Sequence, residues 1–251
     1  MGYNKSFEAA LEQLALDYNC ERARLSGPGI EFFVTPRKRL EGRRIAEFEE
    51  SPLRVLALPG RSVITCTDEL TKDMQRAAKG IGAEWIFETE CQRALDGLLE
   101  HHGLFIADVH EYWLPERQTK LENAPDYDIV WYDREGIKQF EEEDRFSEAY
   151  LFDERRPDMI GVAAVENGRI LGMAGASTDS DIMYQMGVNV EEEGRGRGVA
   201  FTLVTLLKNA ILDMGKIPLY GMVNSHMISK RMAWDTGFKP AWAECYAEET
   251  E

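Results

Sequence analysis

The segment from residue 188 to residue 200 constrains the fold of this chain more than any other part of the sequence. It begins with the alternating apolar residues of a strand and continues into a turn with glycine at every second position, namely Gly194, Gly196 and Gly198. Apolar residues then recur at three- and four-residue steps over residues 200–214, which predicts an amphipathic helix. Such a turn directs unpaired backbone N–H groups and the positive end of the helix dipole to one point, which favours binding of a pyrophosphate.

The glycine spacing narrows the choice of phosphate ligand. A dinucleotide fingerprint needs G-x-G-x-x-G, but Val199 occupies the place of the third glycine, and the chain has no G-x-x-x-x-G-K-[ST] run. The order Arg195-x-x-Gly198-x-Ala200 instead resembles the Q/R-x-x-G-x-G/A signature of the GNAT acetyltransferases. In that family the loop holds the pyrophosphate of acetyl-coenzyme A through main-chain N–H groups. The alternative is a glycine turn that only caps a helix.

A second segment carries the same resemblance. The family pattern N-x-x-[AS]-x-x-[LV]-[YA]-x-x-x-G-F is matched in register by Ser229, Met232, Ala233, Gly237 and Phe238. His226 stands where Asn is usual, and Ala233 stands where many members carry the Tyr that protonates the departing thiolate. The fold assignment is unaffected by these changes, whereas the catalytic assignment is left open.

The resemblance implies an α/β (α+β) protein with the GNAT acyl-CoA N-acyltransferase fold, a mixed and splayed sheet, preceded by a smaller mixed α/β domain. A polar segment bracketed by prolines, residues 115–125, is interpreted as the linker. The expected domains are therefore 1–120 and 126–251. In the second domain, Asp133 is expected to cap a helix over Ile137 and Phe140. Asn167-Gly168 predicts a tight hairpin turn, and one closing strand is expected at 242–246.

The first half predicts alternating helices and strands without catalytic chemistry. Ser6 is expected to cap the first helix, residues 85–87 are expected to form a short strand, and His101-His102 are interpreted as a surface pair at a helix end. The basic residues between positions 37 and 44 are expected to lie on an exposed turn and helix face.

The resemblance implies acetyl-CoA as a co-substrate. The strand at 182–190 is expected to diverge from the strand at 219–223, so that the gap admits the pantetheine arm. Four widely scattered cysteines do not predict a metal site. The expected cofactor-binding residues are Val188, Asn189, Val190, Arg195, Gly196, Arg197, Gly198, Val199, Ala200, His226 and Ser229.

The implied chemistry is direct transfer of acetyl from the thioester to an amine. The backbone N–H of Val190 is the expected donor to the oxyanion, and His226 is the first candidate for the acid, because its unperturbed pKa near 6.5 suits proton transfer at neutral pH. Tyr184 and Ser229 are alternative acids. The base is left unassigned between Asp181 and Gln185.

Charge and composition limit the partners. A net charge of −16 argues against general nucleic-acid binding, which depends on neutralising phosphates. The sequence has neither a bilayer-spanning apolar run nor a signal peptide, so a cytoplasmic enzyme without a membrane partner is expected. The expected acceptor is a primary amine of a small molecule, and a homodimer is left open. The alternative is a catalytically weak protein that binds acyl-CoA as a sensor or scaffold.

Overall fold

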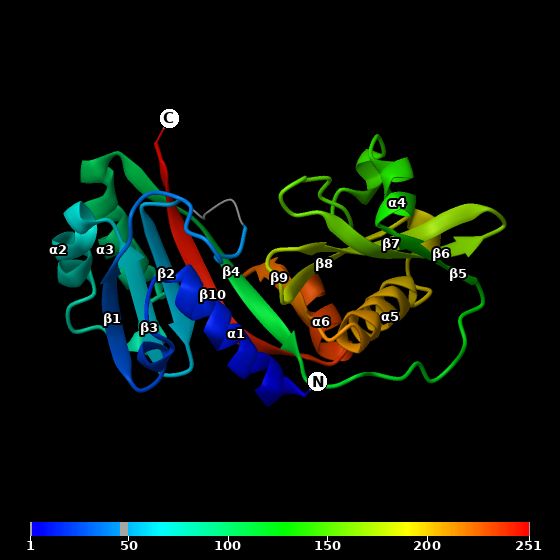
Figure 1. Cartoon of the computed structure of the whole chain (residues 1–251), viewed down its shortest axis with the longest axis horizontal. Coiled ribbons are helices and arrows are strands. Elements are labelled where there is room, and N and C mark those ends of the chain that lie inside the picture. The colour runs from blue at the N-terminus through cyan, green and yellow to red at the C-terminus, as the bar shows by residue number, and fades with distance from the viewer. Residues whose placement is uncertain (1, 46–49, 251) are drawn as a thin grey trace. The chain divides into compact units, whose positions relative to one another are not determined.

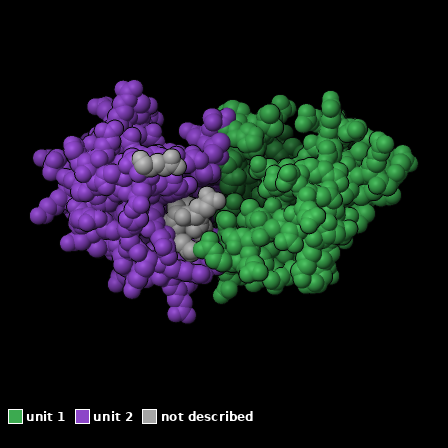
Figure 2. Space-filling model, turned by 90° about the horizontal axis from the view of Figure 1, so that it is seen from above, with its two compact units in different colours: residues 1–6, 113–222, 226–240 green, residues 7–112, 223–225, 241–251 purple. Residues whose placement is uncertain are grey.

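The computed structural model describes residues 2–45 and 50–250, and these fall into two compact units (Figures 1 and 2). Unit 1 comprises residues 1–6, 113–222 and 226–240, and unit 2 comprises residues 7–112, 223–225 and 241–251. The units are therefore not consecutive in the sequence. The chain changes unit after Ser6, before Trp113, on both sides of residues 223–225 and after Pro240, whereas the linker expected from the sequence lies within residues 115–125.

The helices and strands carry the labels of Figure 1. In chain order they are α1 (Tyr3–Asp17), β1 (Gly29–Val34), β2 (Leu53–Leu58), β3 (Arg61–Cys66), α2 (Asp68–Ala77), α3 (Thr89–Leu99), β4 (Leu104–Pro115), β5 (Asp128–Asp133), α4 (Arg134–Ile137), β6 (Asp158–Glu166), β7 (Arg169–Thr178), β8 (Met183–Val190), α5 (Val199–Asp213), β9 (Ile217–Val223), α6 (Met227–Asp235) and β10 (Phe238–Glu249).

Unit 2 is built on a mixed sheet with the strand order β1-β3-β2-β10-β4. β1 and β3 pair in parallel, whereas β2 pairs antiparallel with both β3 and β10. Helices α2 and α3 contact each other, and their buried side chains join those of the strands in one apolar cluster. This cluster is the core of unit 2.

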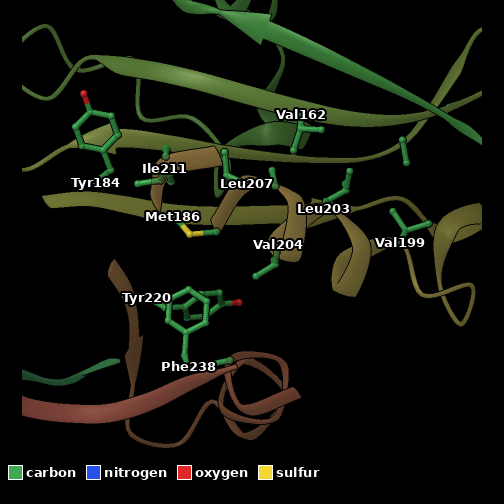
Figure 3. Packing of buried hydrophobic residues seen from close by; sticks show 14 of the residues in the cluster. Val162, Tyr184, Met186, Val199, Leu203, Val204, Leu207, Ile211, Tyr220 and Phe238 are labelled. Carbon is green, nitrogen blue, oxygen red and sulfur yellow. The ribbon is translucent and has the colours of Figure 1, made fainter. Parts of the chain in front are cut away.

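Unit 1 contains a sheet with the strand order β9-β8-β7-β6-β5, in which β8 and β9 are parallel and the other neighbours are antiparallel. Helix α5 covers one face of this sheet, and its buried side chains form the main cluster of the unit, drawn in Figure 3. The opposite face is covered by α4 and the residues that follow it, which form a second cluster around Phe146 and Tyr150. The mixed sheet and the α/β class agree with the sequence.

Two local predictions are confirmed. Asn167 and Gly168 both adopt positive φ, at 51° and 75°, as the tight turn between β6 and β7 requires. Asp133 caps α4, because its carboxylate accepts a hydrogen bond from the backbone N–H of Gly136 at 2.9 Å.

Two local predictions are wrong. The first helix begins at Tyr3, and Ser6 lies inside its first turn, where its N–H donates to the carbonyl of Gly2. Residues 85–87 form no strand; Ala83–Trp85 is a short 3-10 helix, and residues 86–87 form the turn that follows it. The closing strand expected at 242–246 is present within the 12-residue β10, but its residues 243–246 pair with β2, so this part of the strand belongs to unit 2.

A row of glycines crosses unit 1 on the face opposite α5. Gly161, Gly175 and Gly187 lie opposite one another in the pairing of β6, β7 and β8. A Cβ at Gly187 would lie 1.6 Å from the carbonyl oxygen of Glu148, and a Cβ at Gly161 would lie 1.9 Å from the hydroxyl of Tyr150. Because these glycines have no side chains, residues 148–150 can pack directly against the backbone of β6, β7 and β8.

We expect Gly187→Ala to destabilise the protein by about 2–4 kcal/mol, because the methyl group and the Glu148 carbonyl cannot occupy the same space without moving the backbone. Urea denaturation measures the difference. The matched control is Gly97→Ala in α3, an exposed helical position with nothing near its Cβ, which should stabilise by about 0.5–1 kcal/mol. Equal effects of the two variants would contradict this account of the glycine row.

A lysine on α5 is fully buried in unit 1. The ammonium group of Lys208 donates to the carbonyl of Arg117 at 2.9 Å, to the hydroxyl of Thr119 at 2.7 Å, and to the carbonyl of Thr236. Burial, with a smaller contribution from Arg117, lowers the pKa of Lys208 to about 8. This side chain therefore fastens the segment before β5 and the end of α6 to the middle of α5.

We expect Lys208→Met to change how stability depends on pH. Between pH 8 and the lysine's unfolded pKa of about 10.4, the unfolded chain binds more protons at Lys208 than the folded chain does, so the contribution of Lys208 to stability rises with pH in that window. The difference in free energy of unfolding between wild type and Lys208→Met should therefore grow from pH 8 to pH 10 and be constant below pH 7. Urea denaturation across this range is the measurement, and a difference that shrinks with pH would contradict the expectation.

Candidate functional site

The parallel strands β8 and β9 pair over only three residues of the described chain. Residues 183–185 of β8 lie opposite residues 217–219 of β9. Beyond these residues the two strands no longer pair with each other, although β8 continues to Val190 and β9 to Val223. The divergence that the sequence predicts here is therefore present. It opens a gap between two strands in the sheet of unit 1.

The backbone of β8 directs hydrogen-bonding groups into this gap. The backbone N–H of Glu191 donates a hydrogen bond to the carbonyl of Leu171 on β7, at 2.9 Å. Residues that bond to the neighbour and residues that face away alternate along an antiparallel strand. Val190 and Val188 therefore direct their N–H and C=O groups away from β7, to the edge where β9 diverges. These groups are available to a ligand with amide groups of its own.

The glycine turn that follows β8 leaves open space at the start of α5. Gly196 and Gly198 have φ of 72° and 74°, and a Cβ at either position would meet nothing within 4 Å. Gly198 is the N-cap of α5, with no side-chain cap and no acidic residue in the first turn. The first N–H groups of the 15-residue helix, from Val199 onward, are thus uncapped by a side chain, and the helix dipole favours an anion beside them.

Gly194 is needed for a different reason. Its Cβ would lie 2.5 Å from the carbonyl oxygen of Leu171 and 3.1 Å from a methyl group of Val190. The turn therefore lies flat against the end of the sheet, which places the start of α5 beside the open edge of β8.

The two arginines of the turn have different surroundings. Arg197 donates to the carboxylates of Glu166 at 2.7 Å and Asp126 at 3.4 Å, and its guanidinium lies over the ring of Tyr127. The hydrogen bond from Arg197 lowers the pKa of the Glu166 carboxyl. Arg195 is exposed and pairs with no carboxylate among the described residues. Arg197 therefore fixes the turn to the β6–β7 hairpin, and Arg195 is the cation available to an anionic ligand.

Asn189 points to the other face of the sheet. Its side-chain oxygen accepts hydrogen bonds from the backbone N–H groups of Glu148 at 3.0 Å and Ala149 at 2.8 Å. Together with the glycine row, these bonds hold residues 148–150 against β8. The side chain of Asn189 therefore positions this segment.

The start of α6 brings His226 and Ser229 together. His226 is the N-cap residue of α6, and its Nδ1 lies 3.0 Å from the hydroxyl oxygen of Ser229. Ser229 also forms a side-chain hydrogen bond with Tyr220 of β9, and Ala233 lies fully buried in the same cluster as Tyr220. Sequence reasoning missed Tyr220, although the residue follows the last paired position of β9 and shares the strand face of Pro218.

Tyr184 lies in the paired part of β8, opposite Pro218, before the strands diverge. It is buried, which raises the pKa of its hydroxyl, and the ammonium group of Lys216 lies 5.9 Å from the centre of its ring. In Figure 3 the hydroxyl of Tyr184 points away from Tyr220. The structure therefore brings Ser229 and His226 together but places Tyr184 elsewhere.

Residues 2–45 and 50–250 contain no group of three or more His, Cys, Asp or Glu side chains placed to hold a metal ion. Among the same residues, every helix is too short or too polar to cross a bilayer.

Comparison with known proteins gives one family. Residues 118–233 match the model of the acetyltransferase (GNAT) family. No curated protein matches the chain.

Several solved structures resemble the chain at low identity. A GCN5-related N-acetyltransferase-like protein from Streptococcus suis is 16% identical with a TM-score of 0.48, over 98% of this chain and 100% of that one. A putative GNAT acetyltransferase from Novosphingobium aromaticivorans is 17% identical with a TM-score of 0.42, over 58% of this chain and 66% of that one. A GCN5-related N-acetyltransferase from Kribbella flavida is 14% identical with a TM-score of 0.46, over 62% of this chain and 63% of that one.

Proposed function

Because residues 118–233 form a domain of the GNAT acetyltransferase family, we propose that this protein transfers acetyl from acetyl-CoA directly to a primary amine of a small molecule. The observation that carries the proposal is the gap between β8 and β9, which ends beside the uncapped start of α5. A ligand that combines amide groups with a pyrophosphate suits both features, and coenzyme A is such a ligand.

The donor is proposed to lie along β8 and the glycine turn. Outward-facing backbone groups of Val188 and Val190 pair with the amides of the pantetheine arm. The pyrophosphate accepts hydrogen bonds from the N–H groups between Gly196 and Ala200, and Arg195 supplies a positive charge. The contacts of Arg197 with Glu166 support a positioning role for that arginine in the turn.

The proposed reaction develops negative charge first on the carbonyl oxygen of the thioester and then on the leaving sulfur, and each needs a hydrogen-bond or proton donor. The amine must be neutral to attack the thioester carbonyl, and the backbone N–H of Val190 is the proposed donor to the resulting oxyanion. The leaving sulfur then needs a proton. His226 is a proposed participant because its imidazole lies beside Ser229 at the start of α6 and can both donate and accept a proton.

The acceptor is proposed to be a small cationic molecule with a primary amine. A net charge of −16 raises the local concentration of such cations, and this attraction weakens as salt is added. A protein that binds acyl-CoA with little turnover is the second candidate, because Ala233 supplies no hydroxyl at a position where many GNAT members carry Tyr.

Two measurements together test the proposal. Calorimetry with coenzyme A measures donor binding, and release of free thiol from acetyl-CoA measures turnover with a panel containing a polyamine, an aminoglycoside, an amino-acid amide and a short peptide. The expected result is binding together with thiol release that depends on one of the small amines. Binding without turnover would favour the sensor, and absence of binding would sink both candidates.

A further inference from the structure

The buried face of α6 lacks a hydroxyl at Ala233, but the neighbouring strand supplies one. Tyr220 is the first residue of β9 beyond its pairing with β8, and it lies on the face of the sheet that α5 covers. Only 5% of Tyr220 is exposed. Figure 3 shows its ring beside Phe238, on the side of the cluster toward which Met186 and Val204 point. The phenol is therefore fixed at the place where the two strands separate.

A chain of hydrogen bonds joins this phenol to the surface. Ser229 forms a side-chain hydrogen bond with Tyr220, and the Ser229 hydroxyl oxygen lies 3.0 Å from Nδ1 of His226. His226 is exposed, whereas Ser229 is half-buried and Tyr220 is buried. The three groups thus lead from solvent to the gap, and each can both donate and accept a proton.

The surroundings of Tyr220 keep its proton in place at neutral pH. Burial is the largest cause that raises its pKa, to about 12, and the carboxylate of Glu148 raises it further, while the hydrogen bond with Ser229 opposes the shift. Its ring is held by Phe238, at 5.5 Å between ring centres. A protonated and immobilised phenol is suited to donate rather than to accept.

We propose that Tyr220 donates the proton to the departing thiolate of coenzyme A, and that Ser229 and His226 return a proton to Tyr220. This inference rests on the proposed acetyl transfer. It makes Tyr220 a catalytic residue on β9, in a chain whose α6 carries alanine at the position that many relatives fill with tyrosine. Ser229 and His226 then act as a proton path.

The amine nitrogen forms a bond to the thioester carbon and loses a proton to solvent, and the carbonyl electrons move to oxygen. When the carbonyl re-forms, the C–S bond breaks and its electron pair stays on sulfur. The hydroxyl of Tyr220 transfers its proton to that sulfur. The Ser229 hydroxyl gives its proton to the Tyr220 oxygen, Nδ1 of His226 gives a proton to Ser229, and solvent restores His226.

The central test is Tyr220→Phe, which removes only the hydroxyl. We expect thiol release from acetyl-CoA to fall about 100-fold, both with the best amine of the panel and in the slow reaction with water, because both need a protonated leaving group. The dissociation constant of coenzyme A should change less than twofold. The matched control is Tyr150→Phe, which removes a buried hydroxyl bonded to the sulfur of Met173 on the opposite face, and it should leave turnover within twofold of wild type.

A second pair of variants tests the path. Ser229→Ala is expected to lower kcat about tenfold and to move the fall of kcat at high pH to higher pH, because it removes the hydrogen bond that lowers the pKa of Tyr220. Ser229→Thr, which keeps a hydroxyl, should restore both. Thermal unfolding of each variant verifies that the fold is intact.

The outcomes separate the inference from the function on which it rests. Wild-type turnover that survives in Tyr220→Phe overturns the role of Tyr220 and leaves acetyl transfer standing. A loss of coenzyme A affinity in Tyr220→Phe equal to the loss of turnover reduces Tyr220 to a binding or structural residue. A wild-type protein that binds coenzyme A but releases no thiol, with amine or with water, overturns both.

Discussion

Gly198→Glu should abolish binding of coenzyme A, with a loss of affinity of at least about 100-fold. Gly198 has a φ of 74° and open space where its Cβ would be, so the fold can accommodate the new side chain at the cost of local backbone strain. The carboxylate would then occupy the N-terminus of α5, where it satisfies the same N–H groups and repels the pyrophosphate. Calorimetric titration with coenzyme A measures the loss.

The matched control is Gly215→Glu, just beyond the other end of α5. Gly215 has a φ of 76° and equally open space at its Cβ, so the two variants carry the same strain and the same added charge. Gly215→Glu should bind coenzyme A within about twofold of wild type. Equal losses in the two variants would mean that strain or net charge, not occupation of the phosphate site, is responsible. If Gly198→Glu bound coenzyme A with unchanged affinity, the turn would not be part of the binding site.

Arg44→Met should destabilise the protein by about 3–5 kcal/mol, because it leaves two carboxylates buried without their counter-charge. Arg44 donates to Asp17 at the end of α1 and to both carboxylate oxygens of Glu244 on β10, at 2.9 and 3.0 Å. All three side chains are at most 3% exposed. The guanidinium also lies over the rings of Tyr112 and Trp242. Urea denaturation monitored by tryptophan fluorescence measures the change.

Arg37→Met is the control for Arg44→Met. Arg37 pairs with Glu249 of the same strand β10 at 2.9 Å, but its side chain is 49% exposed and that of Glu249 is 67% exposed. Solvent screening limits such a pair to about 1 kcal/mol or less. If Arg44→Met cost no more than Arg37→Met, the buried ion pairs would not stabilise β10 in unit 2.

The sequence was most informative where chemistry is local. The strand, turn and helix around Gly198, the Asn167-Gly168 hairpin and the cap at Asp133 each depend on residues within a few positions of one another, and all three agree with the structure. The divergence of β8 from β9 also agrees with the expectation. That expectation came from the resemblance to a known family and not from a local pattern of residues.

Features that depend on distant residues were not predictable in this way. The basic residues near position 40 were expected at the surface, yet Arg44 is buried. Its partner Glu244 lies 200 positions away in the sequence, so no local pattern indicates that the two residues pair. The sequence did not indicate a functional role for Tyr220, because a single tyrosine in an apolar strand is typical of a hydrophobic core. Its proximity to Ser229 follows only from the packing of β9 against α6. The roles of Glu148 and Asn189 likewise depend on which face of β8 each contacts.

The place of β10 has a consequence for how the chain is made. In unit 2 this strand lies between β2 and β4, although in the described chain it follows all the strands of unit 1 and is synthesised after them. A nascent chain that ends before residue 241 therefore contains β1, β2, β3 and β4 but lacks the part of β10 that lies between β2 and β4. The edges of β2 and β4 would be unpaired for the whole time that unit 1 is being translated, and such edges associate with other chains. Fragments that stop at unit 1 should therefore aggregate through their N-terminal half.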